Sequence, residues 1–153
     1  MKSLELKLPP PVILAIIAAL MWAVAPAGPS LGLGDSWRAT VAIAIAALGV
    51  SIDLFCAISF WRSKTTVNPL SPRKSAALVT SGLYRFSRNP MYLGQALVLV
   101  GWAIFLNSAW GPIGPVAFAL YLNRFQIVPE ELVLGDIFGE TYAKYLESTR
   151  RWI

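Results

Sequence analysis

Apolar residues in this chain gather into long runs instead of alternating with polar ones. Four runs are apolar enough to cross a bilayer, at about residues 9–27, 39–61, 90–110 and 112–128. A transmembrane helix needs about 20 mostly apolar residues, and within these runs only Asp53 and Arg124 are charged. The pattern predicts an all-α integral membrane protein of about four transmembrane helices, built as a single domain over residues 1–153.

The first apolar run has a second interpretation. Lys2 and Lys7 precede it and would form the basic region of a secretory signal peptide. The small residues 23–27 (AVAPA) resemble its cleavage site. A cleaved signal peptide is therefore the alternative to a first membrane helix. We expect that the first run is not cleaved and forms a membrane helix.

The chain after residue 128 differs in composition from the apolar runs. We expect Pro129 to end the fourth run and open a new helical turn, with Glu130 and Glu131 where the helix dipole favours carboxylates. Farther on, aromatic residues recur at helical spacing and i,i+4 charge pairs occupy the other side: Phe138, Tyr142, Tyr145 and Trp152, with Glu140–Lys144 and Glu147–Arg151. This pattern predicts a C-terminal interfacial amphipathic helix.

The distribution of basic residues predicts the orientation in the membrane. The segment between the second and third runs carries six basic residues and no acid: Arg62, Lys64, Arg73, Lys74, Arg85 and Arg88. By the positive-inside rule this loop and both termini face the cytoplasm. The net charge of +5 is therefore a topology signal that also favours contact with membrane lipids, and we expect no nucleic-acid partner.

Composition narrows the chemistry further. Only 14% of residues are charged, mean hydropathy is +0.60, histidine is absent, and Cys56 is the single cysteine. These values exclude an intrachain disulfide framework and a Cys/His metal site. They also exclude catalysis by a histidine-dependent triad. We expect no metal.

Polar residues concentrate in two segments, 63–89 and 124–151. Both reach the same membrane face in the predicted orientation. A site assembled there is open to a water-soluble cofactor from one side and to lipid from the other. Its entrance suits an amphiphilic substrate that arrives sideways between helices.

An ordered set of motifs runs through these segments. They are residues 78–84 (LVTSGLY) and 88–94 (RNPMYLG), then Glu130-Glu131, Phe138-Gly139, Tyr142, Tyr145 and Arg150-Arg151. In this order they resemble the integral-membrane methyltransferases grouped with isoprenylcysteine carboxyl methyltransferase, and more loosely the phospholipid N-methyltransferases. The resemblance covers about residues 64–151.

The resemblance implies that S-adenosylmethionine binds at the cytoplasmic ends of the helices. It carries the cofactor contacts over to Leu78, Val79, Tyr84, Asn89, Pro90, Met91, Tyr92 and Glu130. We also expect Arg88 or Arg151 to bind the carboxylate of the cofactor, because a guanidinium can form two parallel hydrogen bonds with a carboxylate. As candidate catalytic residues we take Arg124, Glu131 and Tyr92. The implied substrate is a lipophilic or prenylated small molecule with a carboxylate or thiol as methyl acceptor.

Two positions depart from the family pattern. Asn89 stands where the family commonly has histidine, and Gln126 stands where it has a substrate-contacting arginine. Arg124 is the nearest cation to the second position. Arg124 is an ionisable residue inside a predicted membrane span, and such residues are candidates for function. We expect Glu130 or Glu131 to be its ion-pair partner.

The chemistry suits a chain without histidine. A sulfonium methyl group is already activated and leaves a neutral thioether behind, so no general acid is needed. The protein has to align the reacting atoms and exclude water. A carboxylate or thiolate acceptor also needs no base.

Two other functions remain open from the sequence. One is an NADPH-dependent membrane ene reductase, since sterol reductases resemble this family in their cofactor pocket. The other is a small four-helix transporter or structural membrane protein, in which Asp53 would be the embedded carboxylate. For Gly94 and Gly101 we expect only a role in close helix packing.

Overall fold

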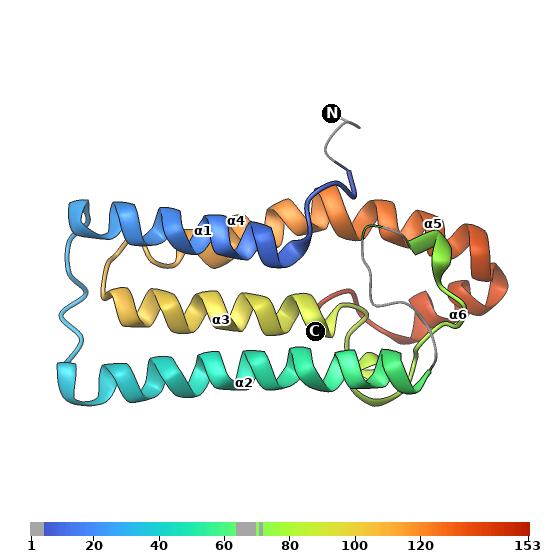
Figure 1. Cartoon of the computed structure of the whole chain (residues 1–153), viewed down its shortest axis with the longest axis horizontal. Coiled ribbons are helices and arrows are strands. Elements are labelled where there is room, and N and C mark those ends of the chain that lie inside the picture. Colours follow the sequence, from blue (N-terminus) through green and yellow to red (C-terminus); the bar gives the residue numbers. More distant parts are fainter. Residues whose placement is uncertain (1–4, 64–69, 71) are drawn as a thin grey trace.

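The computed structural model describes residues 5–63, 70 and 72–153. Across this part the chain is helical, as Figure 1 shows, with α1 (Pro10–Val24), α2 (Asp35–Arg62), α3 (Pro90–Leu106), α4 (Ile113–Leu122), α5 (Val128–Phe138) and α6 (Glu140–Ser148). Single 3₁₀ turns lie between them: η2 (Ala25–Ala27), η3 (Pro72–Lys74) and η4 (Gly82–Arg85). The expected all-α class is confirmed for the described residues, where extended pairing is limited to an isolated bridge between Ser30 and Ser108.

Two segments of the described chain are long and apolar enough to cross a membrane. They are Pro10–Ala27, which joins α1 to η2, and α2. Leu20, Ile43 and Leu54 face outward from these helices with about three-fifths of their surface exposed, as lipid-facing residues do. These two segments overlap the first two expected spans and remain candidates by length and composition, whereas α3 has 17 residues and α4 only ten, so the expected count of four is not confirmed.

Glycines allow α2 and α3 to run antiparallel in close contact (Figure 1). A Cβ on Gly94 would lie 2.5 Å from Asp53 Oδ1 and 2.7 Å from the carbonyl oxygen of Gly49. A Cβ on Gly101 would lie 2.6 Å from the carbonyl oxygen of Ala42. No side chain fits at either position, which confirms the packing role expected for Gly94 and Gly101.

The expectation that Pro129 ends the fourth run is wrong. The helix of α4 continues through a π-helical turn, Asn123–Ile127, directly into α5. The wider turn accommodates a proline, which lacks an N–H and crowds the preceding turn of a regular helix. The Phe125 carbonyl, four residues before Pro129, accepts instead a hydrogen bond from the Leu6 amide at 3.1 Å.

The tail after α5 forms a separate helix because the chain turns at Gly139. Its φ of +50° lies in the region that favours glycine. In α6, Tyr142 and Tyr145 are buried, so the aromatic face of this amphipathic helix packs on the protein itself. The expected pair of Glu140 and Lys144 is present at 3.0 Å.

The prediction that Glu147 pairs with Arg151 is wrong. Helix α6 ends at Ser148 and Thr149 is extended, so Arg151 no longer lies one helical turn beyond Glu147. Its guanidinium contacts Glu131 instead. The chain end thereby returns to α5.

The largest buried apolar cluster lies where α3 meets α1, α4 and the π-helical turn. It comprises Ile13, Met21, Tyr92, Leu99, Ala103, Phe118, Leu122 and Ile127. The Trp102 indole of α3 also donates a hydrogen bond to the Ala18 carbonyl of α1 at 3.0 Å. This core fixes the start of α3 relative to α5, and the site described next depends on that placement.

Candidate active site

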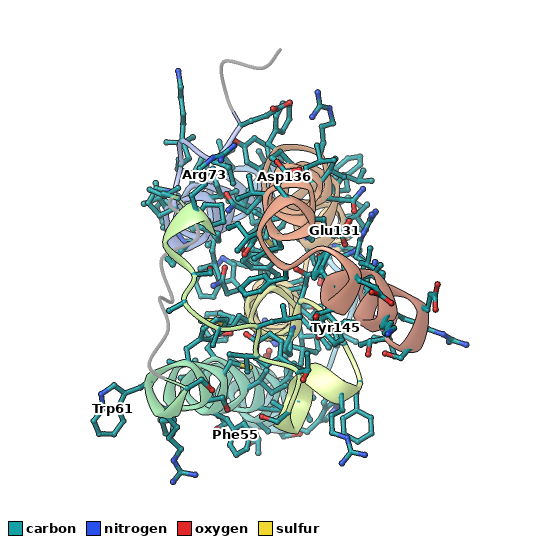
Figure 2. All side chains as sticks on the ribbon, turned by 90° about the vertical axis from the view of Figure 1, so that its right-hand side faces the viewer. Phe55, Trp61, Arg73, Glu131, Asp136 and Tyr145 are labelled. Carbon is teal, nitrogen blue, oxygen red and sulfur yellow. The ribbon has the colours of Figure 1, made fainter. Side chains whose placement is uncertain are left out.

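A cavity of about 220 Å³ lies at the end of the bundle where α2 ends and α3 begins. Figure 2 looks onto this end, with Glu131 and Tyr145 close to its centre and Trp61 projecting outward. The two polar segments that the sequence placed on one membrane face thus wall a shared hollow. Nine of the twelve predicted site residues line it: Leu78, Val79, Tyr84, Arg88, Asn89, Met91, Tyr92, Glu130 and Glu131.

Tyr92 and Glu130 meet in the wall of the cavity. Each lies in the first turn of a helix that has a proline at its start, Pro90 in α3 and Pro129 in α5. The Tyr92 hydroxyl donates a hydrogen bond to Glu130 Oε2 at 2.9 Å. Burial raises the pKa of the Glu130 carboxyl to about 7, although hydrogen bonds from Tyr92 and Gln126 oppose the shift. Glu130 therefore changes charge near neutral pH.

Glu131 is held by two arginines. Arg151 binds it in two-pronged fashion, with Nη2 2.6 Å from Oε2 and Nε 3.1 Å from Oε1, while Arg88 Nη2 lies 3.1 Å from Oε1. Arg88 also donates to the carbonyl oxygen of Thr149 at 2.6 Å. The sequence predicts a guanidinium fork on the carboxylate of the cofactor, whereas the fork seen here, made by Arg151, holds the carboxylate of Glu131. The network ties α5 to the start of α3 and to the chain end.

Aromatic side chains form much of the remaining wall. Phe60, Tyr84, Tyr92, Tyr142 and Tyr145 all line the cavity. The Tyr145 hydroxyl donates to the Tyr84 carbonyl at 2.6 Å, and the Phe60 and Tyr84 rings meet edge to face at 5.4 Å. Burial raises the pKa of Tyr84 and Tyr142 above the usual range, and that of Tyr145 to about 12. These hydroxyls are neutral at physiological pH.

Arg124, one of the predicted catalytic residues, lies away from the cavity and from its expected ion-pair partners. Its Nη1 lies 2.8 Å from Glu5 Oε1, about half of its side chain is exposed, and it does not line the cavity. The expected partners Glu130 and Glu131 are engaged elsewhere. The reason is the fold of the N-terminal segment, which runs past the π-helical turn and brings Glu5 to the outer side of Arg124.

Two other predicted cofactor contacts also lie outside the cavity lining. Pro90 begins α3 and is buried, and Arg151 lies behind Glu131. Both support residues that do line the cavity, because Pro90 sets the start of the helix that carries Tyr92 and Arg151 orients Glu131.

Asn89 and Gln126, the two residues that depart from the family pattern, both contact residues of the predicted site. Gln126 is buried with 2% of its surface exposed, and its side chain interacts with both Tyr92 and Glu130. It supports the hydrogen-bonded pair from outside the cavity lining. Asn89 donates through Nδ2 to the Arg151 carbonyl at 3.0 Å and thereby holds the chain end.

Sequence reasoning missed several residues of the wall. Gln95 of α3 and Phe60 of α2 line the cavity, as do Pro10 and Pro11 at the start of α1. A signal for Gln95 was present, since it is a polar residue inside an apolar run, one helical turn beyond Met91. The contributions of α1 and α2 could not be read from the sequence because they depend on how the helices pack.

Fold and site together define a helical protein with two candidate membrane-spanning segments and an aromatic-walled cavity at one end of its bundle. The phospholipid methyltransferase family profile matches residues 37–141, and the chain belongs to this family. The family resemblance of the motifs is thereby confirmed.

The chain is also similar to several curated proteins. Protein-S-isoprenylcysteine O-methyltransferase A of Arabidopsis thaliana is 33% identical over 115 residues, which cover 73% of this chain and 57% of the relative. The Homo sapiens protein-S-isoprenylcysteine O-methyltransferase is 38% identical over 71 residues, 44% of this chain and 24% of the relative. A Haemophilus influenzae protein described as uncharacterized is 38% identical over 63 residues, 41% of this chain and 100% of that protein.

The chain thus spans little more than half the length of its plant relative. No solved structure matches it.

Proposed function

We propose that this protein is an S-adenosylmethionine-dependent methyltransferase that transfers a methyl group to a lipophilic, prenylated acceptor at the cytoplasmic face of a membrane. The observation that carries the proposal is the Tyr92–Glu130 pair, a buried carboxylate in the wall of an aromatic cavity. Family membership and the names of the relatives support the reaction and the acceptor class.

The residues present fit such a cofactor. A buried carboxylate with a raised pKa, as at Glu130, gains from a cationic ligand group. Aromatic faces also attract cations such as ammonium and sulfonium groups, and Phe60, Tyr84 and Tyr142 are among the aromatic residues in the wall. Arg88 Nε is buried without a hydrogen-bond partner in the described structure and faces the same end of the molecule.

The residues of the chain have to bind the cofactor and the acceptor, orient them, and keep water out of the cavity. When bound, S-adenosylmethionine supplies a methyl group on a sulfonium centre that leaves as a neutral thioether. Glu130 would hold a cationic or hydroxyl group of the cofactor, and Tyr92 keeps that carboxylate in place. A carboxylate or thiolate acceptor brings its own electron pair, which agrees with a sequence without histidine.

Surface charge supports a cytoplasmic position for this end of the bundle. Arg62, Arg73 and Arg85 belong to the elements around the cavity, whereas at the far end Arg38 is paired with Asp35 at 2.6 Å. Of the other basic residues of the loop, Lys64 and the side chain of Lys74 lie outside the described structure. Membrane lipids are the expected surroundings of α1 and α2.

The two alternative functions have less support. A dinucleotide phosphate needs free cations, and the cation found in the described cavity wall, Arg88, is already bound to Glu131. For a transporter, Asp53 would have to face a transport pathway, and it packs instead against Gly94 of α3.

Membranes that contain the full chain test the proposal directly. They are incubated with S-adenosylmethionine labelled on its methyl group and with N-acetyl-S-farnesylcysteine. We expect label in the farnesylated compound, released as methanol by base if the carboxylate is the acceptor. Glu130→Ala membranes should show a loss of at least about tenfold. Absence of label from every extracted species with the unaltered chain would refute the proposal.

A further inference from the structure

Gln95 is a buried polar side chain in an otherwise apolar stretch of α3. Only 6% of its surface is exposed, and it lines the cavity. Its Oε1 is buried and has no hydrogen-bond partner within the described structure. A buried acceptor without a donor is costly, so a side chain that keeps one at a cavity wall is suited to a ligand that brings the donor.

Asp53 of α2 lies behind Gln95 and determines which end of its amide is free. The Gln95 side chain hydrogen-bonds to the Asp53 carboxylate. A carboxylate only accepts, so the NH₂ group of the amide faces Asp53 and the carbonyl oxygen is the atom without a partner. The Oδ1 atom of Asp53 lies close to Gly94 of α3 and has no hydrogen-bond partner of its own in the described structure.

Beyond Gln95 the same face of α3 becomes entirely apolar. A shallow groove of about 430 Å³ runs along it between α1 and α2, with Val98, Leu99 and Trp102 of α3 in its lining. Met91, Gln95, Val98 and Trp102 follow one another at helical spacing of three or four residues, so cavity and groove share one face of the helix. Gln95 thus lies where the cavity, with Tyr92 and Glu130 in its wall, meets an open groove lined by apolar side chains.

We infer that Gln95 recognises the methyl acceptor, with its Oε1 accepting a hydrogen bond from an N–H or O–H near the reacting atom. Asp53 is a positioning residue that holds the amide. The inference rests on the proposed function and narrows its substrate to a lipid-tailed molecule with a hydrogen-bond donor at its head. An amide N–H beside a prenylated carboxyl group is one such donor.

Two matched probes test this inference without requiring turnover. One is N-acetyl-S-farnesylcysteine, and the other is its ester analogue, in which an oxygen replaces the amide N–H. Their affinities are measured on the purified full chain in lipid nanodiscs with S-adenosylhomocysteine present. We expect the amide to bind roughly tenfold more tightly than the ester, as one hydrogen bond to a buried acceptor allows.

Variants assign the discrimination to one side chain. Gln95→Met keeps the length of the side chain without its carbonyl and should reduce the preference for the amide to less than about twofold. Asp53→Ala should reduce it partly while leaving affinity for the ester unchanged, an outcome that a merely structural role would not give. Ser108→Ala is the control, since it removes another buried, unpartnered polar group at the far end of α3 and should keep the preference.

The outcomes separate this inference from the proposed function. Equal affinity of the unaltered chain for both probes, or binding of neither, overturns the role of Gln95 even if S-adenosylmethionine binds. A preference for the amide that persists in Gln95→Met overturns it as well. Failure of the chain to bind S-adenosylmethionine, with the preference for the amide intact and dependent on Gln95, overturns the proposed function alone.

Discussion

The Tyr92 hydroxyl donates a hydrogen bond of 2.9 Å to Glu130 Oε2, across 38 positions of sequence. This contact joins the first turn of α3 to the first turn of α5 over the cavity. The Glu130 carboxyl group lies in the wall of the cavity, and burial raises its pKa to about 7. Ionisation of Glu130 therefore couples the stability of the fold to the state of the site.

Glu130 should make the free protein less stable as pH rises. Its pKa is raised on folding from 4.5 to about 7, so its contribution is retained at acidic pH and lost as pH rises toward 7. Between pH 5 and pH 8 we expect a loss of roughly 2–3 kcal/mol. Thermal unfolding in detergent should show this slope in the unaltered chain and not in Glu130→Gln. A slope equal in both proteins would contradict the assignment.

Removing the charge of Glu131 should destabilise the protein. Glu131→Gln leaves Arg88 and Arg151 without their shared counter-ion, and Arg88 and Glu131 are both largely buried. We expect a loss of roughly 2–4 kcal/mol in the free energy of unfolding, as when one partner of a buried pair is removed. Glu140→Gln, in the exposed pair with Lys144, should cost less than about 1 kcal/mol. Equal costs for the two variants would show that the network is not structural.

Arg124 should be dispensable for cofactor binding. Its side chain pairs with Glu5 away from the cavity, so Arg124→Ala is expected to keep cofactor affinity within about twofold. Tyr92→Phe removes the donor to Glu130 and should weaken cofactor binding by roughly three- to tenfold. Isothermal titration of both variants with S-adenosylmethionine makes the comparison. A larger loss of cofactor affinity in Arg124→Ala than in Tyr92→Phe would show that Arg124 belongs to the cofactor site.

Two helical glycines with different surroundings should respond oppositely to substitution by alanine. Gly101→Ala places a Cβ 2.6 Å from the Ala42 carbonyl oxygen, and backbone cannot move aside without separating α2 from α3. We expect a loss of roughly 1–3 kcal/mol. Gly135→Ala in α5 meets its nearest atom, in the Tyr142 ring, at 3.9 Å and should be neutral or stabilising by up to about 1 kcal/mol. Unfolding in detergent measures both, and a neutral Gly101→Ala would refute the close packing.

Much of the fold follows from the sequence because hydrophobic runs and helix termini are local features. The long apolar stretch of α2 and the glycines opposite it predict a lipid-facing helix packed against α3. The motif residues of the cavity wall, such as Tyr92 and Glu130, were also predictable, since their order along the chain carries the family resemblance.

The features that sequence reasoning missed depend on contacts between distant segments. Pro129 does not end its helix because a π-helical turn and the Leu6 amide together compensate for the missing N–H. The Glu5 partner of Arg124 required the path of the N-terminal segment. Gln95 shows its importance only once its carbonyl oxygen is known to be buried and unpaired.

Binding of S-adenosylmethionine to the purified chain tests the central claim most directly. The unaltered protein is titrated calorimetrically with S-adenosylmethionine and, separately, with NADPH, alongside folded Glu130→Ala and Arg124→Ala variants. The account predicts saturable binding of S-adenosylmethionine to the unaltered and Arg124→Ala proteins, none to Glu130→Ala, and no binding of NADPH. Binding of NADPH alone, or of neither compound, would contradict it.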